Sequence, residues 1–188
     1  VKTLSLIKGR VKHFFSGLAD DVITSSSGTW IGHYEGGGRS GFNTGAGNDI
    51  VTLDGQLAKY SYNHLGEGDD NLILRGGSDS SGDVNVYGNS GNDTVILSGD
   101  APYYLYAWLG EGNDIFNASV ATNVNARSHV FGEKGDDTLI GNDDNTRFSG
   151  GEGDDLIDAS NGNNTISGDA GNDTLVSGSG NDTLYGGD

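Results

Sequence analysis

The sequence contains no cysteine and no methionine, and it has a single proline among its 188 residues. Without cysteine the chain can form neither a disulfide nor a thiolate metal site, although export to an oxidising compartment requires neither. Basic residues are also few: 10 lysines and arginines stand against 27 acidic residues, which gives a formal net charge of -17. This balance disfavours nucleic acids and anionic membranes as partners, and it favours cations.

Long apolar segments are missing as well. There is no run of 18 apolar residues and no signal-peptide core, so we expect no insertion of this segment into a membrane. Because the chain lacks methionine, we expect it to begin inside a longer protein. Glycine is in excess, at 34 residues, while only 33% of the residues are hydrophobic. This composition indicates many tight turns around a thin core shared between stacked turns.

A short phrase recurs eight times: a glycine, an asparagine or aspartate, and an aspartate, followed by a strand-like pair. Successive copies are 21, 23, 21, 23, 18, 18 and 9 residues apart. Since eighteen is twice nine, two nine-residue half-turns make one full turn of a repeating solenoid. Weaker half-turns lie between the strong copies, one of them at Asn164. The final aspartates of the phrase are Asp49, Asp70, Asp93, Asp114, Asp137, Asp155, Asp173 and Asp182.

An apolar residue follows each aspartate at a fixed distance, and these residues are expected to point into the core of short strands. No segment shows a helical period of comparable length. Residues 1–40 fit the repeat worst, and we expect degenerate turns or a cap there, with a weak copy at Asp20-Asp21. Long turns should occupy 41–131 and regular turns 132–188. The expected inward residues are Val51, Leu72, Val95, Phe116, Leu139, Ile157, Leu175 and Leu184.

The repeated aspartates predict a cation. Equivalent residues on paired strands lie about 5 Å apart, and two unit charges at that distance repel by roughly 3 kcal/mol at an effective dielectric near 20. Calcium accepts about six to eight oxygens from carboxylates and carbonyls, whereas magnesium requires a stricter geometry. Zinc and copper prefer histidine or cysteine, which these loops lack. We also expect the extra residues of the long turns to lie on the side opposite the acidic loops. The acidic loops would then form one edge of the solenoid.

Residues 150–158, Gly-Gly-Glu-Gly-Asp-Asp-Leu-Ile-Asp, match the nonapeptide G-G-x-G-x-D-x-U-x of RTX calcium-binding proteins. Residues 177–185 match it in all but the first glycine. From about residue 44 to its end, the chain therefore resembles the RTX (repeats-in-toxin), or hemolysin-type, calcium-binding repeat family. The resemblance implies an all-β fold, a right-handed parallel β-roll of about eight turns with calcium between the turns.

The resemblance also implies a set of ligands. About six calcium ions would lie between successive aspartates, from the pair Asp49/Asp70 to the pair Asp155/Asp173. Asp182 could pair more weakly with Asn164 on the other edge. The 21- and 23-residue turns depart from the family's length of 18. The glycines implied in the sites are Gly45, Gly47, Gly66, Gly68, Gly91, Gly110, Gly112, Gly135, Gly151, Gly153, Gly171, Gly178 and Gly180.

The family further implies type I export from Gram-negative bacteria, in which the chain leaves unfolded and folds in external calcium. We therefore expect a secreted, extracellular or cell-surface module without catalytic activity. Two kinds of parent protein remain open. One is a surface structural protein or adhesin, such as an S-layer component. The other is a toxin or a secreted protease, lipase or epimerase whose active part lies outside this chain.

Aromatic residues form the next pattern. If Leu105 and its alternate neighbours point inward, an outward face is expected from Tyr62, Tyr104, Tyr106 and Trp108. These residues could form a cross-strand ladder that stiffens the sheet, or a face for glycans, another protein or self-association.

Other functions fit the sequence less well. The four histidines share no spacing, and a repeated carboxylate speaks against a single glycosidase-type site. The loops lack the bidentate glutamate of an EF-hand. Turn-forming Asn-Asp pairs would explain single copies but not their regular register.

Overall fold

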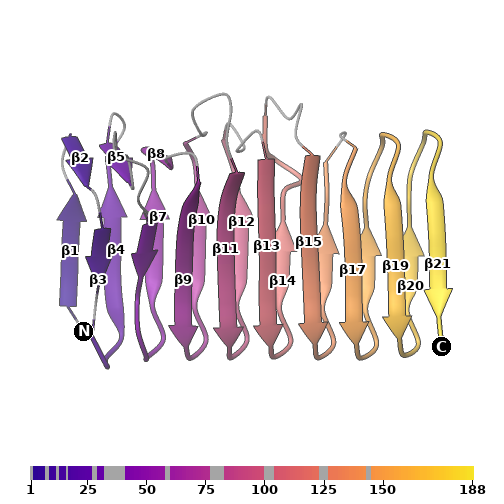
Figure 1. Cartoon of the computed structure of the whole chain (residues 1–188), viewed down its shortest axis with the longest axis horizontal. Coiled ribbons are helices and arrows are strands. Elements are labelled where there is room, and N and C mark those ends of the chain that lie inside the picture. The colour runs from indigo at the N-terminus through magenta and orange to yellow at the C-terminus, as the bar shows by residue number, and fades with distance from the viewer. Residues whose placement is uncertain are drawn as a thin grey trace.

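The computed structural model describes residues 2–6, 9–11, 13–15, 17–26, 29–31, 41–57, 60–76, 83–99, 104–122, 127–142 and 145–188. All regular structure in this part is β-strand, and the strands form two long sheets that lie face to face (Figure 1). Nowhere in these segments is there a helix long and apolar enough to cross a membrane.

Each long sheet contains nine strands. The first sheet is formed, in order, by β1 (Lys2–Leu6), β4 (Asp21–Ser25), β7 (Ile50–Leu53), β10 (Asn71–Leu74), β12 (Thr94–Leu97), β14 (Ile115–Asn117), β16 (Thr138–Ile140), β18 (Leu156–Asp158) and β20 (Thr174–Val176). The second is formed by β3 (His13–Phe15), β6 (Gly41–Asn43), β9 (Ser61–Glu67), β11 (Asp83–Ser90), β13 (Tyr104–Glu111), β15 (Arg127–Lys134), β17 (Arg147–Glu152), β19 (Thr165–Ala170) and β21 (Thr183–Gly187).

The chain alternates between the two sheets, and every described strand pair is parallel, as in β10 with β12 and β11 with β13. One strand from each sheet makes one coil, so the predicted parallel β-roll is confirmed. About seven regular coils run from β7 and β9 to β20 and β21, slightly fewer than the eight predicted. The difference arises because the copies at Asp173 and Asp182 precede the two strands of the same last coil.

Pairing keeps the aspartate loops in register even where the turns differ in length. Asn71 and Thr94 each follow a loop aspartate and pair with one another, as do Thr138 and Leu156. The differences in turn length therefore do not fall in the acidic loops or in the strands that follow them. The extra residues are expected on the other side of the roll, which we call the opposite edge, where residues 77–82, 100–103 and 123–126 lie outside the described residues.

A third, three-stranded sheet lies at the opposite edge of the first coils (upper left in Figure 1). It contains β2 (Gly9–Val11), β5 (Thr29–Ile31) and β8 (Gln56–Leu57). The weak copy at Asp20-Asp21 is also confirmed, since Val22 pairs with Ile50 and Asp21 is buried. Residues 1, 7–8, 12, 16, 27–28 and 32–40 lie outside the described part.

The core is a thin layer between the two long sheets. Six of the eight predicted inward residues are buried, with an exposed fraction of 1% or less: Val51, Leu72, Val95, Phe116, Leu139 and Ile157. Leu175 is only partly buried and Leu184 is 44% exposed. Leu175 lies in β20 and Leu184 in β21, the two strands of the last coil, which has a neighbouring coil on one side only. Burial in a solenoid depends on the adjacent coils as well as on the facing sheet.

Candidate metal centre

Short loops join the second sheet to the first along one side of the roll, at the lower margin of Figure 1, which we call the acidic edge. Its loops are residues 47–49, 68–70, 91–93, 112–114, 135–137, 153–155 and 171–173. Each begins with a glycine whose φ is positive, such as Gly68 at 121°. A side chain at Gly68 would also collide with the backbone of Gly47 in the previous coil. Glycine is thus required both for backbone conformation and for close packing of coils.

The last residues of these loops form an inner column of aspartates, which are buried except for the half-buried Asp173. The backbone N–H of each donates to Oδ1 of the aspartate in the next coil, for example from Asp49 to Asp70 at 2.7 Å. All six pairs implied by the RTX resemblance are therefore neighbours in the structure. The other five are Asp70/Asp93, Asp93/Asp114, Asp114/Asp137, Asp137/Asp155 and Asp155/Asp173, at 2.7 to 2.9 Å.

The middle residues of the loops form an outer column of hydrogen bonds with the reverse direction. Here Oδ1 of Asn48 accepts from the N–H of Asp69 at 3.1 Å, and Oδ1 of Asp69 accepts from Asn92 at 2.8 Å. The same contact continues to Asn172 at the end of the roll. Either asparagine or aspartate can occupy this position, because both supply the required side-chain oxygen.

The second carboxylate oxygen of the inner aspartates lacks a partner. Among the described residues, Oδ2 is buried without a hydrogen bond in Asp70, Asp93, Asp114, Asp137, Asp155 and Asp173. Burial, partly opposed by the backbone hydrogen bond, raises the pKa of Asp93 to about 8 and that of Asp137 to about 7. The same causes raise the pKa of Asp70 and of Asp114 to about 6. A buried acceptor without a partner is costly, and more so when it is charged.

In four loops, a glycine without a side chain lets this oxygen and a carbonyl oxygen of the next coil approach one another, an arrangement that we call an open cradle. A Cβ atom added to Gly150 would come within 3.0 Å of both Oδ2 of Asp155 and the carbonyl oxygen of Gly168 in the next coil. Two acceptors thus converge, and Oδ2 has no donor, which is an arrangement that a hard cation stabilises. The cradles are those of Gly88 with Asp93 and Leu109, Gly132 with Asp137 and Gly150, Gly150 with Asp155 and Gly168, and Gly168 with Asp173 and Gly186.

The carboxylates are strung along the edge, one per coil. Within the described residues, no three histidine, cysteine, aspartate or glutamate side chains gather at one point. A cation in a cradle would therefore take several of its ligands from backbone carbonyl groups. Calcium accepts such ligands readily, whereas zinc and copper require nitrogen or sulfur donors.

Comparison with known protein families agrees with this chemistry. The model of the RTX calcium-binding nonapeptide repeat matches four segments, residues 78–101, 128–157, 140–175 and 158–188. Residues 78–101 and 128–188 thus carry RTX calcium-binding nonapeptide repeats. Neither the curated proteins nor the solved structures give a significant match. The matches reach the long turns as well as the regular ones, and RTX nonapeptide repeats bind calcium.

The predicted glycines of the RTX loops occupy two kinds of position. Those that open the three-residue loops are described above. The others on the acidic edge lie two residues earlier, where Gly45, Gly66, Gly110 and Gly151 have φ angles of 101° to 122°. Asn89, Glu133 and Asp169 hold the equivalent position in other coils, with φ angles of 72° to 81°. Gly178 and Gly180 lie on the opposite edge, and Asp182 follows them there.

The residue that opens each cradle was not predicted from the sequence. Gly88, Gly132, Gly150 and Gly168 were not among the predicted residues, although each corresponds to the first glycine of the RTX nonapeptide. The remaining RTX loops of this edge carry Thr44, Leu65 and Leu109 at that position. The Thr44 hydroxyl donates to the carbonyl oxygen of Leu65, so a hydrogen-bond donor already serves that carbonyl group. The seven loops are therefore not equivalent.

The aromatic residues lie on the outer face of the second sheet and form a ladder. Trp108 stacks between Tyr87 and Phe131, with ring centroids 4.9 and 5.7 Å apart and planes within 9°. His64 continues the stack beyond Tyr87 at 4.5 Å. Tyr106 stacks beside Trp108 at 5.8 Å, whereas Tyr62 and Tyr104 lie on the same face at half-buried positions. The stacked rings turn their planes toward one another, as expected for a ladder that stiffens the sheet.

Proposed function

We propose that this chain is a calcium-dependent folding module of a secreted bacterial protein, and that calcium binds in the open cradles of the acidic edge. One observation carries the proposal: each cradle brings a buried carboxylate oxygen without a partner and a carbonyl oxygen of the next coil around one space. The four cradles support four ions, fewer than the six implied by the RTX resemblance.

Electrostatics explains why folding would depend on the ion. Without a cation, the inner column holds buried carboxyl groups that resist ionisation, as the raised pKa of Asp93 and of Asp137 indicates. When these groups ionise, neighbouring carboxylates repel one another. A divalent ion between them attracts both and thereby cross-links adjacent coils. Because the unfolded chain does not hold these oxygens together, binding and folding are coupled. Stability then rises with the free calcium concentration.

This coupling suits a protein that is made where free calcium is scarce and that works where it is abundant. RTX repeat proteins are typically secreted, and a chain that stays unfolded before export can pass through a narrow exporter. Our proposal therefore places this module outside the cell or on its surface. The ion acts here as a structural element, and no catalytic step is assigned to the chain.

For the parent protein, we favour a role in surface structure, adhesion or assembly. The long flat roll presents a rigid aromatic face, and rigidity is useful in a spacer or a structural unit. A toxin or a secreted enzyme remains the second candidate, because the same module would serve its folding after export. Self-association and glycan binding stay predictions that belong to the first candidate.

The decisive experiment is a folding titration. Far-UV circular dichroism is recorded in a chelator and then at rising calcium, with magnesium at equal concentration as the control. The proposal predicts a cooperative gain of β-structure in calcium at neutral pH and little change in magnesium. A spectrum that stays the same in chelator and in calcium would contradict calcium-coupled folding. Size-exclusion chromatography across the same titration tests assembly, since a strict monomer would weaken the first candidate.

A further inference from the structure

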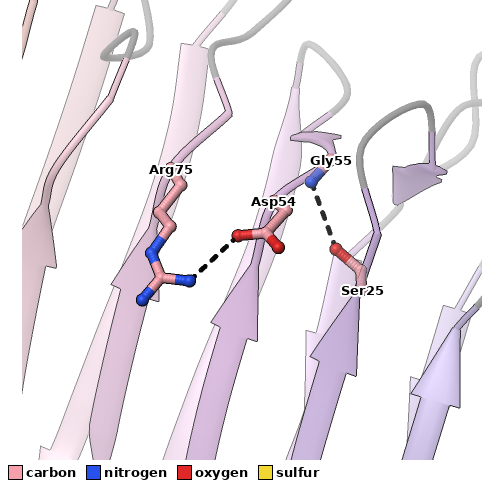
Figure 2. Close-up of polar contacts among 4 residues, drawn as sticks. All are labelled: Ser25, Asp54, Gly55 and Arg75. Carbon is pink, nitrogen blue, oxygen red and sulfur yellow. Dashed lines mark hydrogen bonds and ion pairs between the residues drawn. The ribbon is translucent and has the colours of Figure 1, made fainter.

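The opposite edge differs in the way its coils are joined. In the early coils, ordinary polar contacts hold it: the N–H of Gly55 donates to Oγ of Ser25 at 3.2 Å (Figure 2). Arg75 forms an ion pair with Asp54 at 3.3 Å in the next pair of coils (Figure 2). In the last coils, loops of RTX type return on this edge, and their inner residues are Thr146, Asn164 and Asp182.

These late loops repeat the hydrogen bonds of the acidic edge. The N–H of Thr146 donates to Oδ1 of Asn164 at 2.9 Å, and the N–H of Asn164 donates to Oδ1 of Asp182 at 2.8 Å. The outer residues Asn145 and Asn163 are joined in the reverse direction, at 2.7 Å. Asn164 therefore occupies the place on this edge that an inner aspartate such as Asp155 occupies on the acidic edge.

The amide group of Asn164 is oriented by these contacts. Its Oδ1 accepts from a backbone N–H, so Nδ2 must lie on the other side of the group. There, Nδ2 donates to carbonyl oxygens of Asn161 at 3.3 Å, Ser177 at 3.4 Å and Ser160 at 3.5 Å. The side chain is 1% exposed, so water does not compete strongly for these contacts.

The same place in the acidic edge lacks a donor. Oδ2 of Asp155 has no partner and lies near the carbonyl oxygen of Gly168, which begins the next loop as Ser177 does on the opposite edge. We infer that Asn164 closes the opposite edge without a cation, its amide N–H groups binding the carbonyl oxygens that a calcium ion would otherwise bind. This inference rests on the proposed function of the acidic edge, and it removes the expected weak pair Asn164/Asp182 from the calcium sites.

The inference makes residue 164 a determinant of ion binding. An aspartate there would keep the hydrogen bond from Thr146 and would replace the donor Nδ2 by a charged acceptor among three carbonyl oxygens. That arrangement is costly unless a cation binds. Asp182 would contribute only its hydrogen bond to Asn164, so its charge is dispensable.

The test counts calcium ions per chain by isothermal titration calorimetry and atomic emission. Asn164→Asp is expected to bind one ion more than the wild type and to need more calcium for folding. Asn163→Asp makes the same change in the exposed outer column and should leave the count unchanged. Asp182→Asn should also leave it unchanged. An unchanged count in Asn164→Asp, or the loss of one ion in Asp182→Asn, would overturn the inference.

A second measurement does not depend on the ion count. The side-chain amide protons of Asn164, identified in NMR spectra by their loss in Asn164→Asp, should exchange with solvent at least about tenfold more slowly than those of exposed Asn163. Fast exchange would overturn the inference even if the acidic edge binds calcium. Slow exchange in a protein that binds no calcium would support it while contradicting the proposed function.

Discussion

The N–H of Asp155 donates to Oδ1 of Asp173 in the next coil at 2.9 Å, while Oδ2 of each aspartate remains buried without a partner in the described structure. One oxygen thus fixes the register of neighbouring coils, and the other is left for a ligand. The hydrogen bond also fixes the direction of the carboxylate, so the cradle is shaped before an ion arrives. Preformed oxygens reduce the ordering cost of binding.

Removing the charge of Asp155 should abolish one calcium site. In Asp155→Asn the amide keeps an Oδ1 acceptor, and its Nδ2 supplies a donor as in Asn164. We expect one ion fewer per chain and a weaker dependence of folding on calcium, measured by calorimetry and circular dichroism.

Asp154→Asn is the matched control for that change. It removes the same charge from the exposed outer column, where asparagine occurs naturally in other coils. An equal loss of calcium in both variants would refute the assignment of the inner column.

Filling one cradle should have a similar effect. The Cβ of Gly150→Ala would lie within 3.0 Å of Oδ2 of Asp155 and of the carbonyl oxygen of Gly168. The change should therefore displace these oxygens, lower the ion count by one and raise the calcium concentration at the folding midpoint by about tenfold, which corresponds to 1.4 kcal/mol. Gly186→Ala is the control, because nothing lies within 4 Å of its Cβ position. Equal midpoints in both variants would count against the cradle.

The metal-free protein should become less stable as the pH rises. Burial raises the pKa of Asp93 to about 8 and of Asp137 to about 7, from the usual 3.8. A raised pKa in the folded state means that the folded state binds protons more tightly than the unfolded one. This stabilisation is complete below about pH 4 and is lost as the pH rises to about 8. Circular dichroism in chelator should therefore show a folded protein at pH 5 and an unfolded protein at pH 8.

Calcium should reverse that pH dependence, since its carboxylate ligands must be deprotonated. The calcium affinity is therefore expected to rise between pH 5 and pH 8. Asp93→Asn, which removes the group with the highest pKa in the column, should flatten both profiles. A metal-free protein whose stability increases with pH over this range would contradict the account.

The aromatic ladder should contribute to stability rather than to calcium binding. Trp108→Ala removes three ring contacts, with Tyr87, Phe131 and Tyr106. We expect a loss of about 2 kcal/mol in the free energy of unfolding at saturating calcium, with the ion count unchanged.

Tyr185→Ala is the control for the ladder, because this ring is 58% exposed on the last strand. A loss of glycan-array binding in Trp108→Ala or Tyr106→Ala, with stability retained, would instead favour the adhesion hypothesis.

The spacing of the aspartates was enough to predict the acidic edge. Strands that pair in parallel place equivalent residues side by side, so a fixed phrase such as that of Asp137 and Asp155 must form a column. The glycine loops and the alternating apolar residues followed from the same periodicity. The first glycine of the nonapeptide could have been recognised too, since Gly150 fills that position in the best copy.

Differences between the coils depended on tertiary structure. The sequence treated Asp70 and Asp155 as equal, but only Asp155 faces a cradle opened by glycine, whereas Leu65 precedes the loop of Asp70. The sequence likewise suggested a weak cation pair at Asn164, where the structure places an amide among carbonyl oxygens. These contacts join residues of neighbouring coils, and they depend on which side-chain oxygen faces which carbonyl group.

Composition and periodicity by themselves determined a repeating solenoid with a column of acidic loops that favours a cation, because repetition dictates which residues stack; the resemblance to the RTX nonapeptide then implied a calcium-binding β-roll. Tertiary structure alone decided which loops keep an open cradle and which carry a donor or a side chain instead. The physical reason is that a cation site depends on the direction of individual oxygens and on the space between two coils, and both are set only when the coils pack.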